Sequence, residues 1–191
     1  DHLIVVTRTD GGDNDRDGLT LFLVDATAPG IRRMRTNMVD TRNSANIEFE
    51  KVAVTANAVI GTPGSGLEIL EPVLDGARAG LAAEMLGTGQ EVFDRTLEYL
   101  KVREQFGAPI GSFQALKHRA AEMYCEIELT RSATYGALAA IDAKDGETAA
   151  LASAAKAKAC DMLELVSNEA IQMHGGIGMT DEADIGLFLK R

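Results

Sequence analysis

Apolar and β-branched residues fall in short runs along the first part of the chain, from Leu3 to Val6 and from Leu19 to Val24. Polar or glycine-rich segments separate these runs, and a further apolar set follows at Ile47, Phe49, Val52 and Val54. Short runs of this composition between turn residues are typical of β-strands. The pattern therefore predicts a small antiparallel β domain over residues 1 to about 54.

From about Gly66 onward the pattern becomes helical, because Ala, Leu, Glu, Met and Lys predominate and only Pro72 and Pro109 interrupt it. We expect long helices over about residues 67–102, 112–143 and 147–173, and the start of a fourth near Asp181. Pro72 marks the place where the first helix would bend or restart. Ser112 is the expected N-cap of the second helix, and Gly175-Gly176 the expected end of the third.

Long antiparallel helices joined by short links predict a four-helix bundle. The expected fold class is therefore α+β, with a small antiparallel β-barrel-like or sandwich-like domain in residues 1–60 and a helical bundle domain in residues 61–191. Glycine and proline residues between positions 55 and 66 mark the boundary. On the second helix, a roughly helical spacing is kept by the expected core set of Leu116, Met123, Ile127, Thr134, Leu138 and Ile141.

Composition and charge exclude several classes of function. The chain is 46% hydrophobic and 25% charged, as in soluble globular proteins, and its net charge is -10. Such a charge opposes binding to nucleic acid or to an anionic membrane surface. No apolar run approaches the roughly 18 residues that cross a bilayer, so we expect no membrane insertion. A small anionic ligand is still allowed, because a few arginines can hold a phosphate on an acidic protein.

Two motifs that suggest other chemistry have simpler interpretations. Cys125 and Cys160 lie far apart without a CxxC pattern, so we expect buried free thiols in a reducing compartment and no metal site. The segment Asp13–Gly18 is similar to the first half of a calcium loop, but Val24 stands where that loop needs glutamate. We expect an acidic hairpin loop there.

Three groups of polar residues are candidates for ligand binding. Arg103 follows the first long helix, where it would either stabilise the helix dipole or grip a phosphate. The segment Gln172–Gly178 closes the third helix with glycines that cap it or let backbone N–H groups approach a ligand. Asp75 and Arg78 share one helix face, as a local ion pair or as ligand contacts.

The order of these segments resembles the C-terminal helical domain of the acyl-CoA dehydrogenase family. The resemblance rests on Arg103-Glu104-Gln105-Phe106-Gly107, then Gln114, then Gln172-Met173-His174-Gly175-Gly176-Ile177-Gly178. Upstream, Phe49–Val54 and Val59–Gly61 resemble the end of the family's middle β domain, and Leu74–Arg78 its substrate-lining helix. The family's helical N-terminal domain has no counterpart here, so we interpret the chain as a fragment.

The resemblance implies an FAD site shared across a subunit boundary. It assigns cofactor contacts to Arg103 at the pyrophosphate, to Phe106 near the adenosine, and to Gln105, Gln114, Gln172, Gly175 and Gly176. It assigns Asp75 and Arg78 to the acyl-CoA cleft. His174 is expected to be a side chain near the glycine turn, with a catalytic acid or base as the alternative. His118 lies on a helix and is expected to be structural.

The implied activity is α,β-desaturation of an acyl-CoA thioester, with electrons passed to an electron-transferring flavoprotein. The resemblance also implies a homodimer or homotetramer, or a heteromer, in the cytoplasm or, in a eukaryote, the mitochondrial matrix. Ala77 occupies one of the family's two positions for the catalytic glutamate, and the other falls beyond Arg191. We therefore expect no catalytic base in this chain. The alternative is a non-catalytic partner subunit that completes the FAD site of a heteromeric enzyme.

Overall fold

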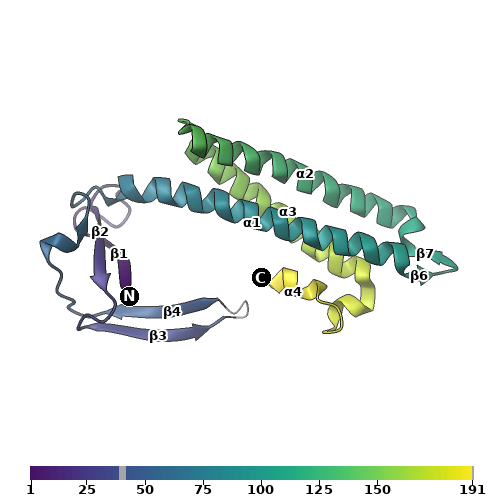
Figure 1. The fold of residues 1–191 in the computed structure, drawn as a ribbon, viewed down its shortest axis with the longest axis horizontal. Coiled ribbons are helices and arrows are strands. Elements are labelled where there is room, and N and C mark those ends of the chain that lie inside the picture. The colour runs from purple at the N-terminus through teal and green to yellow at the C-terminus, as the bar shows by residue number, and fades with distance from the viewer. Residues whose placement is uncertain (39–41, 191) are drawn as a thin grey trace. The chain divides into compact units, whose positions relative to one another are not determined.

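The computed structural model describes residues 1–38 and 42–190, which fall into two compact units, Asp1–Leu74 and Asp75–Arg191 (Figure 1). The first unit is mostly strands and the second is helical, so the expected α+β fold class is confirmed. The division lies inside a long helix, α1 (Gly66–Val102), whose first turns pack on the sheet of the first unit. The expected domain boundary at residue 60 stays a prediction. Arg191, where the second expected domain ends, lies outside the described residues.

One antiparallel sheet of the first unit has the order β1 (His2–Arg8), β2 (Leu19–Asp25), β5 (Val59–Ile60). The acidic segment connects β1 to β2, as expected for a hairpin loop. The Arg8 guanidinium organises this loop by donating hydrogen bonds to the carbonyl oxygens of Asp10, Asp15 and Asp17, at 3.2, 2.7 and 2.9 Å. Its acidic side chains therefore stay in solvent, and the described residues contain no group of ligands that could hold a metal ion.

The second sheet pairs β3 (Ile31–Asn37) with β4 (Asn43–Phe49), and the sequence pattern predicted only part of it. β3 was not expected, because Arg32, Arg33 and Arg35 hide its alternation. The strand expected from Ile47 to Val54 ends at Phe49, so Val52 and Val54 lie outside the sheet. Pairing ends at Phe49, and Lys51 then takes a left-handed conformation with φ of 50°, which turns the chain out of the sheet.

The helical unit contains most of α1, then α2 (Gln114–Ala143), α3 (Thr148–His174) and the short α4 (Ile185–Lys190). Contrary to expectation, α1 does not restart at Pro72. Glu68 and Pro72 are both exposed, so water can satisfy the carbonyl that proline leaves without a donor. Ser112 does not cap α2, because its hydroxyl donates to the carbonyl of Pro109 at 2.7 Å and the helix begins at Gln114.

Two clusters of buried side chains fill the helical unit. Larger residues form one cluster with members on every helix, including Val92, Met123, Met162 and Ile185. Six fully buried alanines form the second, which we call the alanine cluster: Ala79, Ala82, Ala137, Ala152, Ala155 and Ala159. Small side chains let helix backbones approach closely. In agreement with this, α2 and α3 are the most closely packed helix pair (Figure 1).

Met162 of α3 fits closely against α1. A Cβ atom built on Gly89 would lie 2.5 Å from the Met162 sulfur, so the methionine occupies the space that glycine leaves. This contact packs α1 against the α2–α3 pair.

Both cysteines are free and exposed, so the buried thiols expected from the sequence are wrong. Cys125 lies two residues from the buried Met123 and Ile127, and two residues rotate a helical side chain about 200° away from the core face. Cys160 similarly falls between the buried Ala159 and Met162.

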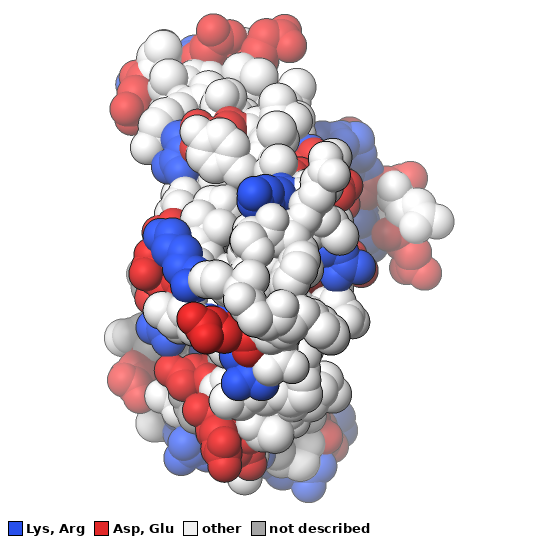
Figure 2. Space-filling view, turned by 90° about the vertical axis from the view of Figure 1, so that its right-hand side faces the viewer, with Lys and Arg blue, Asp and Glu red and all other residues white. Residues whose placement is uncertain are grey.

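Several charged side chains of the helical unit form ion pairs, and Figure 2 shows acidic and basic side chains in mixed groups on one face. Arg95 of α1 bonds Glu91 at 2.7 Å and Asp184 at 3.0 Å, and lies 5.3 Å from the ring centre of Phe188. The Glu91 carboxylate raises the pKa of Arg95. These contacts attach α4 to α1. Within residues 1–38 and 42–190, no helix is long and apolar enough to cross a membrane.

The alanine cluster gives a test of the close packing. Ala155→Leu should lower the free energy of unfolding by about 1–3 kcal/mol, because the larger side chain has no space between fully buried neighbours. Ala154→Leu is the matched control, since Ala154 is exposed and leucine is a good helix former. Urea unfolding of both variants measures the difference. Equal stability of the two variants would contradict close packing at Ala155.

Candidate functional site

The C-terminal ends of α1 and α3 lie together, which brings two of the predicted site segments to one end of the helical unit. The Tyr99 hydroxyl of α1 donates a hydrogen bond to the carbonyl oxygen of His174 at 3.2 Å. Their rings stack with centres 4.3 Å apart and planes inclined by 21°. The chain reaches Arg103 four residues after Tyr99, and the glycine turn begins directly after His174.

Arg103 leads into a tight hairpin. β6 (Glu104–Gln105) pairs with β7 (Ala108–Pro109), and Phe106 and Gly107 form the turn with φ of 56° and 77°. Two central residues with positive φ are typical of a type I′ turn. The backbone of Arg103 is held on both sides, since its N–H donates to Tyr99 at 2.9 Å and its carbonyl accepts from Ile110 at 2.8 Å.

The side chains of this hairpin are exposed. Phe106 is 93% exposed although it is aromatic, and its only described ring partner is Phe113, edge to face at 6.1 Å. A bulky residue with positive φ is uncommon, and such outliers concentrate at functional sites. The hairpin therefore combines an aromatic ring exposed to solvent with an unfavourable backbone conformation at the same residue.

Arg103 is the one arginine among residues 75–190 whose guanidinium makes no hydrogen bond or ion pair within the described chain. Arg78 bonds Asp75, Arg95 bonds Glu91 and Asp184, Arg119 pairs with Glu169, and Arg131 bonds Glu128 and Gln90. A free, exposed guanidinium at the end of a helix can take a phosphate in two hydrogen bonds.

Gln114 is the first residue of α2 and is exposed beside this hairpin. It directly follows Phe113, whose ring contacts Phe106. The first turn of a helix carries free N–H groups and partial positive charge, which also favours an anion.

The glycines of the turn after α3 differ in what they do. Gly178 is required by packing, because a Cβ atom there would lie 2.7 Å from the carbonyl oxygen of Ile171. Gly175 has φ of 65°, a left-handed backbone conformation that favours glycine at this position. Gly176 has no positive φ, and a Cβ atom on it would have no neighbour within 4 Å. Nothing in the described structure requires glycine at position 176, so its backbone is open to a ligand.

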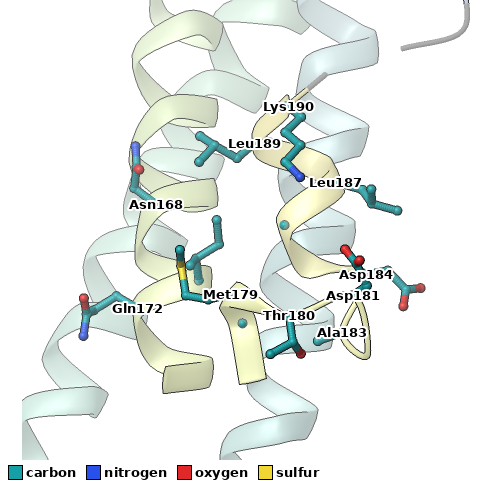
Figure 3. A pocket seen from close by; sticks show the side chains of 13 residues that line it. Asn168, Gln172, Met179, Thr180, Asp181, Ala183, Asp184, Leu187, Leu189 and Lys190 are labelled. Atoms are coloured by element: carbon teal, nitrogen blue, oxygen red, sulfur yellow. The ribbon is translucent and has the colours of Figure 1, made fainter. Parts of the chain in front are cut away.

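A cavity of about 540 Å³ lies between α3, the turn and α4 (Figure 3). On one side α3 contributes Asn168 and Gln172, which are one helical turn apart, and the segment from Met179 to Lys190 forms the other side. Of these two residues, only Gln172 was expected from the sequence. The spacing of Asn168 four residues before it was a signal that could have extended the site along α3.

Asp75 and Arg78 form the ion pair that their spacing allows, with Arg78 Nη1 2.6 Å from Asp75 Oδ1. The Asp75 carboxylate is buried and the Arg78 side chain is 41% exposed. They lie 28 and 25 residues before Arg103, which directly follows α1, and this separation is roughly 40 Å at 1.5 Å per residue. The structure thus does not bring them to the Arg103 end.

The two candidate histidines have different places. The Nδ1 atom of His174 lies 2.7 Å from the carbonyl oxygen of Ala170, and its ring stacks on Tyr99, so it has a structural role at the turn. His118 is exposed near the start of α2.

The residues at the Arg103 end fit FAD. A free guanidinium suits its pyrophosphate, an exposed phenyl ring suits its flat adenine, and an open glycine backbone lets N–H groups approach either part. Gln105, Gln114 and Gln172 add exposed amides that can both donate and accept hydrogen bonds.

Residues 64–191 match the family model for the acyl-CoA dehydrogenase C-terminal domain. The chain is 34% identical over 176 residues to the mitochondrial short/branched chain specific acyl-CoA dehydrogenase of Rattus norvegicus, covering 91% of this chain and 40% of that protein. Its fold resembles butyryl-CoA dehydrogenase from Megasphaera elsdenii, with a TM-score of 0.91, 30% identity, and coverage of 100% and 50% of the two chains.

A third similar protein is the Tcur3481-Tcur3483 steroid ACAD, with a TM-score of 0.79, 36% identity, and coverage of 99% of this chain and 48% of that one. The chain thus spans between 40% and 50% of the length of these three relatives.

Stability measurements can test whether Gly178 serves packing and Gly176 does not. Gly178→Ala should lower the free energy of unfolding by about 1–3 kcal/mol, because its Cβ would overlap the Ile171 carbonyl. Gly176→Ala should change it by no more than about 0.5 kcal/mol. Thermal unfolding of the two variants without ligand makes the comparison. A large loss in Gly176→Ala would mean that this glycine serves packing and not a ligand.

Proposed function

This chain belongs to the acyl-CoA dehydrogenase family, and we propose that it forms the cofactor-binding helical part of an FAD-dependent enzyme that oxidises acyl-CoA thioesters. The proposed reaction is α,β-desaturation, with electrons passed to an electron-transferring flavoprotein. One observation carries the proposal. The hairpin after α1 and the glycine turn after α3 lie at the same end of the helical unit, with the side chains of Arg103, Phe106 and Gln172 exposed.

Each residue of this end has a proposed task. Arg103 neutralises and orients the FAD pyrophosphate, and Phe106 packs on the adenosine. Gln105, Gln114 and Gln172 provide hydrogen bonds, and Gly175 and Gly176 admit the cofactor close to the backbone. FAD, when bound, accepts the electrons of the oxidation.

We propose that this end of the chain completes the FAD site of a second subunit. A Phe106 ring that is 93% exposed and an arginine without a partner suit groups that are covered by another molecule. The expected assembly is a homodimer or homotetramer. We propose that the subunits associate through α2, because Tyr124, Leu129 and Tyr135 are exposed on it.

Asp75 and Arg78 are proposed to line the acyl-CoA cleft. The buried Asp75 carboxylate fixes the direction of the Arg78 guanidinium, which remains 41% exposed and able to meet a polar part of the thioester ligand. The proposed location is the cytoplasm, or the mitochondrial matrix in a eukaryote, as the name of the rat relative suggests.

A second candidate function is that of a non-catalytic subunit of a heteromeric enzyme. Ala77 at one of the family's glutamate positions favours it, and so does the two-part name of the Tcur3481-Tcur3483 relative. If the chain instead belongs to a complete enzyme, the purified full-length protein alone should oxidise acyl-CoA in the presence of an artificial electron acceptor. Turnover that requires a second polypeptide would favour the partner-subunit function.

Removal of the free guanidinium tests the FAD site. Arg103→Ala should weaken FAD binding by about 1.5–3 kcal/mol, through the loss of a charge-assisted phosphate contact. The FAD affinity of Arg103→Lys should fall between those of the unmodified protein and Arg103→Ala, because lysine keeps the charge but not the forked geometry. The measurement is the FAD dissociation constant of the enzyme. Lys101→Ala is the control, since Lys101 pairs with Glu98 and should not contact the cofactor. Flavin content that survives dialysis unchanged in Arg103→Ala would contradict the proposal.

The helix carboxylates test where the catalytic base lies. Glu84 is seven residues from Ala77, roughly 10 Å along the helix, and Asp75 is committed to Arg78. Neither is placed to act as the family's base. Asp75→Asn and Glu84→Gln should therefore reduce kcat by less than about 10-fold, with Asp75→Asn raising KM. Steady-state kinetics with FAD occupancy measured in parallel gives the answer. A fall in kcat of about 1,000-fold or more, with FAD and substrate still bound, would identify that carboxylate as the base.

A further inference from the structure

We propose that Tyr99 is a positioning residue of the FAD site, which acts with His174 to hold Arg103 and the glycine turn at a fixed separation. The inference rests on the proposed function, because it gives this contact a purpose only if both segments bind one cofactor. It concerns residues that need not touch FAD themselves.

Tyr99 connects to both segments by different atoms. Its backbone carbonyl accepts the N–H of Arg103 at 2.9 Å, so the position of Arg103 follows from that of Tyr99. Its hydroxyl donates to the carbonyl of His174 at 3.2 Å, one residue before the glycine turn. A single residue of α1 thereby links two segments that are 75 residues apart in sequence.

His174 is in turn fixed by its own helix. A carbonyl oxygen only accepts hydrogen bonds, so the Nδ1 atom 2.7 Å from the Ala170 carbonyl must carry a proton. This bond sets the plane of the imidazole ring relative to α3. The Tyr99 ring stacks on that plane at 4.3 Å, so the stack transmits the position of α3 to the end of α1.

The cofactor contacts need such a link because the side-chain contacts within each segment do not connect the hairpin to the glycine turn. Arg103 has no side-chain partner among the described residues, and Gln105 and Phe106 are exposed. The adjacent residues Leu100 and Met173 pack in the core and hold the helices together in a general way. The half-buried Tyr99–His174 contact lies beside them, about one helical turn before Arg103, so a small shift there would misplace Arg103 against the phosphate.

The experiment compares FAD dissociation constants of the enzyme carrying Tyr99→Phe, which keeps the stack, or Tyr99→Leu, which removes it. We expect binding about 3- to 10-fold weaker for Tyr99→Phe and about 10- to 50-fold weaker for Tyr99→Leu. Tyr124→Phe is the matched control, because its ring also packs on a neighbouring helix residue, Phe93. No hydrogen bond to its hydroxyl is present in the described chain, so binding should be unchanged.

A double-mutant cycle separates positioning from general structural support. If Tyr99 acts through Arg103, then Tyr99→Leu should weaken FAD binding by less than about 2-fold in an Arg103→Ala background. The visible circular dichroism of bound flavin should change in Tyr99→Leu and not in Tyr124→Phe. Both measurements are made well below the unfolding midpoint of each variant.

The outcomes are distinct. If Arg103→Ala weakens FAD binding but the Tyr99 variants do not, or if their effects simply multiply, the inference is overturned and the proposed function stands. If Arg103→Ala leaves FAD binding unchanged, the proposed function fails and the inference fails with it. If Tyr99→Leu does not fold, the same criteria apply to Tyr99→Phe, which retains the ring and its volume.

Discussion

The packing of three long helices around one shared core is the constraint on which the candidate site depends. α1, α2 and α3 alternate in direction, so the ends of α1 and α3 arrive at the same end of the helical unit (Figure 1). The fully buried alanines allow α2 and α3 to approach closely, and Met162 fits the space left by Gly89. The core thus sets the helix axes, and the axes set where Arg103 and the glycine turn can be.

The structure also separates residues that look alike in sequence. Gly176 and Gly178 stand in one motif, yet packing requires only Gly178. Arg103 and Arg95 both lie near the end of α1, yet Arg95 is used to hold α4. Family resemblance assigns roles to a motif as a whole. Local geometry divides the motif into residues that the fold needs and residues that it leaves free for a ligand.

The helices could be predicted from sequence because composition and terminal glycines agree over long stretches, whereas Pro72 suggested a bend or restart and α1 continues through it. Both ends of α3 and the C-terminal end of α2 were predicted to within one residue, and the start of α2 to within two. β3 was missed because its arginines face solvent in a small sheet, where apolar alternation is not needed. The stack of Tyr99 on His174 could not be predicted, because it joins positions 75 residues apart and depends on the axial register of two helices.

The turn at Phe106 has a thermodynamic consequence for assembly. In the isolated subunit, Phe106 has two unfavourable contributions to its free energy. Its phenyl ring is 93% exposed to water, and its backbone φ of 56° is strained for a residue with a bulky side chain. A molecule that covers the ring recovers the free energy of its exposure only in the bound state. If FAD and a second subunit share this end of the chain, as proposed, cofactor loading and subunit association are linked equilibria. Linkage then requires the fraction of cofactor-loaded protein to rise with protein concentration, even at a constant concentration of free FAD.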